Sequence, residues 1–205
     1  MIVELCEQLL LELERAKSPV LSYLQPGISE SEVDSRLKSA NIDIVFPEEV
    51  HALYGWRNGI NNEDAETKTL GALRLFKLGI FVSLDFSISN YLEWVIQYDY
   101  WPKGLFPLFD SGAGGDYYLI DTNKQSVTHG MILYYSVSNP YFQGTSSIFD
   151  SLDLCLTTII ECYREKAYYF NPDSSALQIE SPLEMAIWRK RNPNSEYYKI
   201  LDQFK

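Results

Sequence analysis

The sequence predicts an α+β fold in which an antiparallel β-sheet is covered by helices on one side. Segments with helical spacing of apolar residues come at both ends of the chain, and a strand-rich stretch with short polar turns lies between them. This order lacks the regular alternation of strand and helix that builds a parallel sheet. The 205 residues are enough to bury a large core without a metal ion or a disulfide.

Two helices are expected at the N-terminus. Residues 2–17 place apolar side chains at spacings of three and four, with glutamates largely on the opposite side, which is typical of an amphipathic helix. Pro19 limits its extent. Ser29 and Glu32 then have the spacing of a capping box, which predicts a second helix that ends near Ala40.

A third helix is expected to begin at Pro47, because the fixed φ of proline suits the first turn of a helix. Asn58 and Gly59 would end it, since both residue types readily adopt the left-handed conformation. Residues 60–69 are polar and lack periodicity, so an exposed loop is expected there. Residues 70–76, LGALRLF, are expected to form a strand.

The middle of the chain is expected to hold one helix and then the sheet. Residues 87–98 have apolar side chains at helical spacing. Strands are predicted for residues 106–110, 116–122 and 127–137, joined by a glycine-rich turn and by the polar turn 123–126. Short turns between neighbouring strands imply antiparallel pairing.

The C-terminal part is expected to be helical. A long helix is predicted for residues 150–169, whose apolar residues form one stripe. The tail, residues 171–205, contains two short helical patches, 182–191 and 195–204, each preceded by an Asn-Pro motif.

The chain is acidic, with 17 Lys and Arg against 28 Asp and Glu and a formal net charge of −11. The excess lies entirely in residues 1–170, and residues 1–66 alone carry five basic and 13 acidic groups. Binding to nucleic acid or to an anionic membrane needs a clustered basic surface, so neither partner is expected. A basic protein partner is compatible with this charge, although acidity also keeps proteins soluble.

Cysteine use and hydropathy indicate a reduced, soluble and cytoplasmic protein. Cys6, Cys155 and Cys162 offer no disulfide framework and no Cys-x-x-Cys metal pair, and they are expected to be buried. The N-terminal segment lacks the basic start of a secretory signal. No apolar run has the length of a membrane-spanning helix.

The sequence motifs predict no cofactor, no metal site and no enzymatic activity. The stretch Gly112–Asp116 lacks the Lys-Ser/Thr of a phosphate-binding P-loop and precedes a strand, so it is expected to be a turn. His51 and His129, the two histidines of the chain, have no nucleophile motif beside them. A small hydrolase that uses these histidines or a carboxylate pair is the least favoured alternative.

Aromatic residues are plentiful, with 15 Tyr, 10 Phe and 4 Trp, and several stand beside acids. Exposed Tyr and Trp are efficient anchors of protein interfaces, and acids beside them suit a basic partner. Core packing is the alternative role for any one of them. Acidic and aromatic residues in segments expected to be irregular give the predicted partner-binding set: Glu63, Asp64, Glu66, Asp99, Tyr100, Trp101 and Asp110.

Four stretches of the chain are informative as an ordered set. Residues 46–54 followed by Asn58-Gly59 give a proline, a short helix and an Asn-Gly pair. Residues 101–109 and 114–121 give a Pro-Phe, Gly-Asp, strand and Asp block, and residues 151–163 give a closing helix. This set, over residues 30–165, resembles the SUKH superfamily, which includes fungal cell-wall assembly regulators and many bacterial immunity proteins.

The resemblance implies an α+β domain with an antiparallel sheet that acts by binding protein rather than by catalysis. The favoured role is that of an immunity protein that neutralises a cognate bacterial toxin, and the acidic body would suit a basic nuclease-type toxin. The alternative is a regulatory scaffold of the cell-wall assembly regulator type. A monomer or a weak dimer is expected.

The resemblance also implies where the domain ends and which residues shape it. Residues 1–170 would form the SUKH-like domain with its N-terminal helical extension, and residues 171–205 would form a helical extension packed on the same domain. The residues that match family positions of chiefly architectural importance are Pro47, Asn58, Gly59, Gly115, Asp116 and Asp121.

Overall fold

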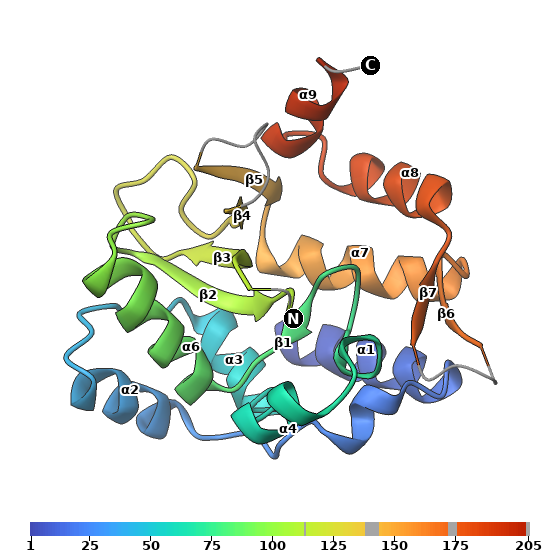
Figure 1. Ribbon diagram of the computed structural model, residues 1–205. Coiled ribbons are helices and arrows are strands. Elements are labelled where there is room, and N and C mark those ends of the chain that lie inside the picture. The colour runs from blue at the N-terminus through green and yellow to red at the C-terminus, as the bar shows by residue number, and fades with distance from the viewer. Residues whose placement is uncertain (113, 138–143, 172–175, 204–205) are drawn as a thin grey trace.

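A five-stranded antiparallel sheet forms the centre of the computed structural model, which describes residues 1–112, 114–137, 144–171 and 176–203 (Figure 1). Neighbours in the sheet are also neighbours in the chain, in the order β1-β2-β3-β4-β5. The α+β class is therefore confirmed. The strands are β1 (Ile80–Phe81), β2 (Leu105–Asp110), β3 (Asp116–Asp121), β4 (Ile132–Ser136) and β5 (Thr145–Phe149).

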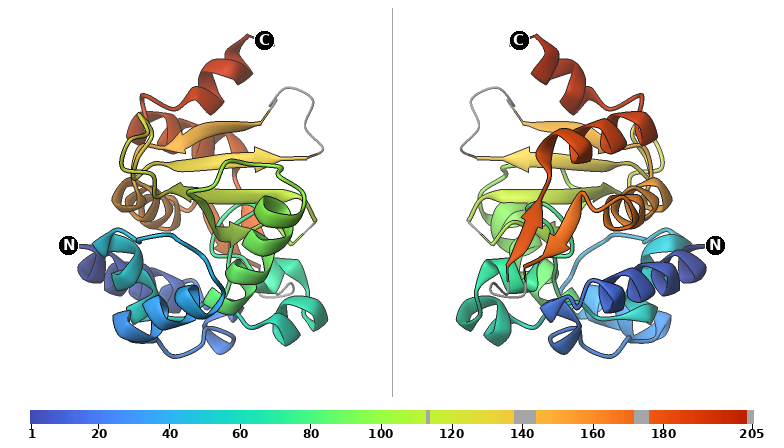
Figure 2. Two further views of the ribbon diagram at one scale, coloured as in Figure 1. Left: turned by 90° about the vertical axis from the view of Figure 1, so that its left-hand side faces the viewer. Right: turned by 90° about the vertical axis from the view of Figure 1, so that its right-hand side faces the viewer.

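Helices lie on both faces of the sheet, not on one face as the sequence predicted. Helices α7 (Leu152–Arg164) and α8 (Ser181–Arg191) lie on one side, and α6 (Leu84–Tyr91) lies on the other (Figures 1 and 2). A π-helical turn, η2 (Leu92–Gln97), continues α6. Every residue of β2 and β4 is buried, as expected of strands with cover on both faces.

Three helices of the N-terminal part begin and end close to where the sequence predicted. They are α1 (Ile2–Arg15), α2 (Glu30–Ser39) and α3 (Glu48–Trp56), with a short 3₁₀-helix η1 (Pro19–Ser22) after the first. The Ser29 side chain accepts a hydrogen bond of 3.2 Å from the Glu32 amide, so the predicted cap of α2 is confirmed. Pro47 precedes the first turn of α3.

Two predictions for residues 60–76 are wrong. The expected loop contains a short helix, α4 (Asn62–Thr67), because the Asn61 side chain accepts a hydrogen bond of 2.7 Å from the Asp64 amide and caps it. The first four residues of the expected strand form one helical turn instead, α5 (Leu70–Leu73). Apolar runs as short as LGALRLF do not distinguish a strand from a buried helical turn by their pattern alone.

The later strands also differ from the prediction. The predicted strand 127–137 begins only at Ile132, because residues 122–130 fold into a turn. The strand β5 was not predicted, since its sequence TSSIF is mostly small and polar. The predicted helix 150–169 ends at Arg164, and a small hairpin of β6 (Tyr168–Phe170) and β7 (Leu177–Ile179) follows it.

The C-terminal residues pack against the rest of the chain through α8 and α9 (Glu196–Asp202). The Trp188 ring of α8 lies 4.7 Å from the Phe149 ring of β5. The Ser195 hydroxyl donates to the Ser147 carbonyl at 3.0 Å, and the Glu196 amide donates to the Ser147 hydroxyl at 3.1 Å. The start of α9 is thereby fixed to β5, the last strand of the sheet.

The described residues share one hydrophobic core, which runs from Ile2 of α1 to Tyr198 of α9. All three cysteines are buried free thiols, as expected. Burial raises the pKa of the Cys6 and Cys162 thiols to about 12, so they are not poised as nucleophiles. Within the described part of the chain, none of the helices combines the length and the apolar character needed to cross a membrane.

Candidate protein-binding surface

Aromatic rings gather where the π-helical turn η2 leads into β2. Trp94 and Trp101 stack with their ring centres 5.9 Å apart and their planes 6° apart. The Tyr100 ring lies 5.0 Å from that of Trp94, and the Tyr98 ring lies 5.7 Å from that of Tyr100. The four rings therefore form a continuous series from Trp101 to Tyr98.

Trp101 is the buried end of this series. Its side chain is 2% exposed, and its indole N–H donates to the Leu105 carbonyl at 3.0 Å. The rings of Tyr117 in β3 and Tyr135 in β4 lie 5.3 and 5.0 Å from it. The expectation that Trp101 is an exposed contact residue is wrong, because its ring fills the space between η2 and the sheet.

The other end of the series is open to solvent. Tyr98 and Tyr100 are each 50% exposed, and Trp94 is partly buried. We call Trp94, Tyr98 and Tyr100 the aromatic ridge. Two exposed carboxylates, Glu93 and Asp99, belong to the same segment. Helix α6, from which η2 continues, covers the sheet face that is turned to the viewer in the left panel of Figure 2.

The backbone of this segment is unusual and well bonded. The Tyr98 amide donates to the Glu93 carbonyl at 3.1 Å, and the Tyr100 amide donates to the Trp94 carbonyl at 2.8 Å. Asp99, between them, has a φ of +55°, a conformation that few non-glycine residues adopt. π-Helical turns and such residues are frequent at functional sites. The sharp turn holds the two exposed tyrosines side by side.

Asp110 does not belong to this surface. It is 6% exposed, and its carboxylate accepts hydrogen bonds from the Gly112 amide at 2.5 Å and from the Asn90 side chain at 3.4 Å. Burial raises the pKa of the Asp110 carboxyl above its usual value, although both hydrogen bonds oppose the shift. The expectation of an exposed Asp110 is wrong, because the residue ends a buried strand and caps the following turn.

The acids of the predicted loop lie elsewhere on the molecule. Glu63 and Glu66 are exposed on α4, and Asp64 is partly buried there. Figure 1 shows α4 at the bottom of the molecule and the segment 98–101 at the left, beyond the far end of α6. The structure therefore brings Asp99 and Tyr100 into one surface but does not bring the three acids of α4 to it.

The segment between α3 and α6 contains Asn58 and Gly59, which match family positions. The Asn58 side chain accepts a hydrogen bond of 3.0 Å from the Leu84 amide and donates to Gln25 at 3.4 Å. Gly59 has a φ of +60°, and a Cβ there would lie 2.4 Å from the Val82 carbonyl. Only glycine fits this position without moving the backbone.

The two ends of β3 are shaped by three residues that match family positions: Gly115, Asp116 and Asp121. Gly115 has a φ of +113°, and a Cβ there would lie 2.3 Å from the Val137 side chain. Asp116 then begins the strand and pairs with Ser136. At the other end, the Asp121 carboxylate accepts hydrogen bonds from the Asn123 amide at 2.9 Å and from the Thr128 hydroxyl at 2.7 Å. These are contacts within the fold.

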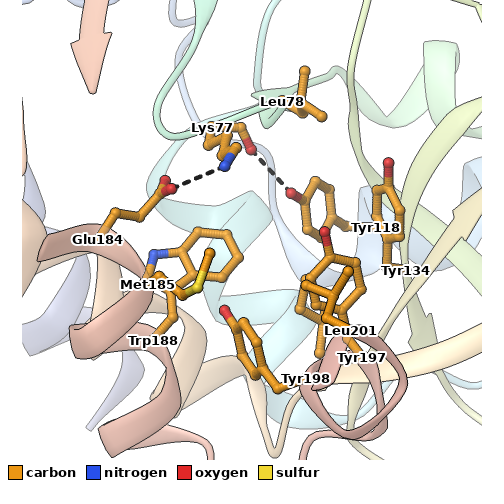
Figure 3. Close-up of a pocket in the computed structure, with 11 residues that line it drawn as sticks. Lys77, Leu78, Tyr118, Tyr134, Glu184, Met185, Trp188, Tyr197, Tyr198 and Leu201 are labelled. Carbon is orange, nitrogen blue, oxygen red and sulfur yellow. Dashed lines mark hydrogen bonds and ion pairs between the residues drawn. The ribbon is translucent and has the colours of Figure 1, made fainter. Parts of the chain in front are cut away.

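A small cavity of about 50 Å³ lies between the sheet and the C-terminal helices (Figure 3). Glu184 of α8 pairs with Lys77 at 3.1 Å and accepts a hydrogen bond of 2.6 Å from the Tyr168 hydroxyl, to which the Trp188 indole donates at 3.1 Å. The Tyr118 hydroxyl donates to the Lys77 carbonyl at 2.9 Å. The space suits one or a few water molecules rather than a substrate, so this region joins α8 to the sheet.

A larger hollow of about 350 Å³ lies beside His129 and is lined by Glu49, Asp150 and Asp153 among others. Ser151 also lines it, but the Ser151 hydroxyl accepts a hydrogen bond of 3.1 Å from the Leu154 amide as the N-cap of α7. In the parts of the chain that the structure describes, no hydrogen bond links the His129 ring to a carboxylate. The hollow thus brings His129 and three carboxylates into one lining without a hydrogen bond that pairs them.

Comparison with known proteins tests the resemblance to the SUKH superfamily. A search of curated proteins gave no match. Residues 28–156 match the family model described as the SMI1 / KNR4 family (SUKH-1). The matched region begins just before α2 and ends within α7, so it contains the whole five-stranded sheet and the aromatic ridge. Because the match spans more than half of the chain, the chain belongs to the SMI1 / KNR4 family (SUKH-1).

Proposed function

We propose that this chain is a non-enzymatic protein-binding domain, and specifically an immunity protein that neutralises a cognate bacterial toxin by binding it. The observation that carries the proposal is the aromatic ridge. Tyr98 and Tyr100 are half exposed, yet the Tyr98 ring packs at a tilt against Tyr100 and the Tyr100 ring against Trp94. Trp94 in turn stacks on buried Trp101. Tyrosine and tryptophan dominate the binding energy of many protein interfaces.

The aromatic ridge is already held in place before binding, so its side chains lose less conformational entropy when a partner binds. An immobilised side chain costs about 0.5–1.5 kcal/mol at an interface, and rings that are packed against each other before binding lose less of this than mobile ones. The carboxylates of Glu93 and Asp99 add charge complementarity to a basic partner, which acts mainly on the rate of association. The net charge of −11 supports the same kind of partner.

The proposal is tested with the product of the gene beside that of this chain, which the proposal expects to be toxic. Co-expression of the wild-type chain should protect cells from that protein, and the two purified proteins should bind. A Tyr98→Ala/Tyr100→Ala variant should bind at least about tenfold more weakly, because loss of an interface anchor costs at least about 1.4 kcal/mol. A Glu93→Lys/Asp99→Lys variant should mainly slow association and reduce its dependence on salt.

Tyr169→Ala is the matched control, because Tyr169 is a 40% exposed tyrosine on β6. It should bind and protect like the wild type. If the ridge variant also binds like the wild type, the ridge is not the interface. A Glu63→Lys/Asp64→Lys/Glu66→Lys variant with unchanged affinity would remove α4 from the interface. Lack of any binding or protection would reject the immunity role and favour the regulatory scaffold.

A further inference from the structure

Helices α2 and α3 bring one imidazole and two carboxylates together on the surface, away from the aromatic ridge. The His51 Nε2 atom of α3 lies 3.0 Å from the Asp34 Oδ1 atom of α2. Glu30 stands one helical turn before Asp34, so both carboxylates share a face of α2. One potential ligand atom from each of the three residues lies within 4.8 Å of the other two.

The histidine is held in place for this arrangement. Its side chain is only 11% exposed, and its ring meets the Phe46 ring edge-on with the centres 5.9 Å apart. Packing therefore fixes the direction in which Nε2 points. Asp34, by contrast, is 61% exposed, and Glu30 is exposed at the start of the helix, so both carboxylates can adjust.

The acids at this place make few ion pairs among the described residues, although Lys38 stands one helical turn after Asp34 on the same helix. In the described parts of the chain, the one ion pair of Asp34 is with His51, which is charged only when protonated, and Glu30 has none. Arg36, the nearest arginine in sequence, pairs with Glu32 and Asp85 instead. The helix dipole accounts for Glu30 in the first turn but not for Asp34, and two acids four residues apart on a helix repel each other.

We propose that Glu30, Asp34 and His51 form a binding site for a divalent transition-metal ion, with Zn²⁺ as the best match. A mixed nitrogen and oxygen donor set that includes imidazole suits Zn²⁺ better than Mg²⁺ or Ca²⁺, which prefer oxygen alone. Ligands about 2.1 Å from a tetrahedral ion are about 3.4 Å apart. The His51–Asp34 pair is already near that separation, and rotation of the exposed Glu30 side chain brings in the third ligand.

Such an ion would connect α2 to α3 and relieve the repulsion between the two acids. Three protein ligands leave at least one coordination position for water or for a side chain of another protein. The site does not depend on the proposed toxin-binding role, because its residues lie outside the aromatic ridge.

The test is a titration of the purified, chelator-treated full chain with ZnCl₂ by isothermal calorimetry, with thermal unfolding recorded in parallel. The wild type should bind one ion per chain and unfold at a higher temperature as Zn²⁺ increases. Asp34→Asn, Glu30→Gln and His51→Ala should each weaken binding by about tenfold or more. Asp34→Asn preserves size and the capacity for a hydrogen bond, so it separates loss of the ion from loss of the fold.

Two controls keep the test specific. His129→Ala removes the other histidine of the chain, and Glu32→Gln removes another acid of α2 that faces Arg36. Both variants should bind Zn²⁺ like the wild type. No saturable binding to the wild type would overturn the site, and so would Asp34→Asn and His51→Ala variants that bind as tightly as the controls.

Discussion

At the scale of single residues, Asp121 shows how a residue that matches a family position stabilises the fold. Its side chain is buried and receives hydrogen bonds from Asn123 and Thr128, while the Gly130 amide donates to its carbonyl at 2.8 Å. One residue thus holds both ends of the turn between β3 and β4. The sequence shows an Asp near the end of a predicted strand, but the hydrogen-bond donors to it are fixed only when the turn has folded.

Asp110 gives a prediction for pH dependence. Burial raises its pKa above the value of 3.8 that an exposed aspartate has, so the folded protein holds this proton more tightly than the unfolded chain does. The stability that this group contributes is therefore present below the unfolded-state value and is lost as the pH rises through the raised value.

The measurement compares the wild type with Asp110→Asn, which cannot titrate at this position. Urea denaturation from about pH 4 to about pH 7 should show the unfolding free energy of the wild type falling relative to that of the variant. An Asp43→Asn variant, at an exposed position, should follow the wild type at each pH. A constant difference between wild type and Asp110→Asn across this range would contradict the prediction.

At the scale of elements, local signals predict the longer helices well but the short helices and the strands unevenly. The cap at Ser29 is a contact between residues close in sequence, so the pattern alone locates the start of α2. The β5 strand could not be found in this way, because its polar residues are buried by pairing with β4 and by contacts from Ser195 and Glu196. Ser195 and Glu196 are distant from β5 in sequence, so their contacts leave no local signal.

The candidate site was only partly predictable for a related reason. Asp99 and Tyr100 were identified from the acid and aromatic residues in an irregular segment, and both are exposed. The sequence predicts a regular helix around Trp94, and its stacking on Trp101 does not follow from that prediction. The π-helical turn η2 changes the direction of the chain after α6, and helical periodicity of 3.6 residues does not reveal such a turn.

The ion pair between Glu184 of α8 and Lys77 gives a second prediction. Glu184 is 3% exposed and Lys77 is 42% exposed, so the two partners of this ion pair are not equivalent. Lys77→Met leaves a buried carboxylate without its cation and should destabilise the protein by about 3 kcal/mol. Glu184→Gln retains an acceptor for Tyr168 and leaves a lysine that can reach water, so it should cost only about 1 kcal/mol.

Urea denaturation of both single variants and of the double variant checks this asymmetry. The double variant should resemble Glu184→Gln, because the buried charge is then absent. Equal destabilisation by the two single changes would show that the buried carboxylate is not the source of the loss.

At the scale of the whole molecule, the region that matches the family model is shorter than the part of the chain that shares one hydrophobic core. The match covers residues 28–156, and α1 and α8 lie outside it. Yet Ile2 of α1 and Trp188 of α8 belong to the same hydrophobic core as the sheet. Glu161 of α7 also pairs with Lys190 and Arg191 of α8. We therefore expect the parts outside the match to unfold together with the sheet.

Native-state hydrogen exchange, followed by mass spectrometry at increasing urea concentration, tests this expectation. Amides in the middle of α1 and α8 should exchange with the same opening free energy as those of β3, within about 1 kcal/mol. The helix α4 is the internal control: its exposed residues include Glu63 and Glu66, so it should open locally and exchange much sooner. If α8 instead exchanges as fast as α4 while β3 stays protected, the C-terminal helices are a separately opening appendage and not part of the cooperative unit.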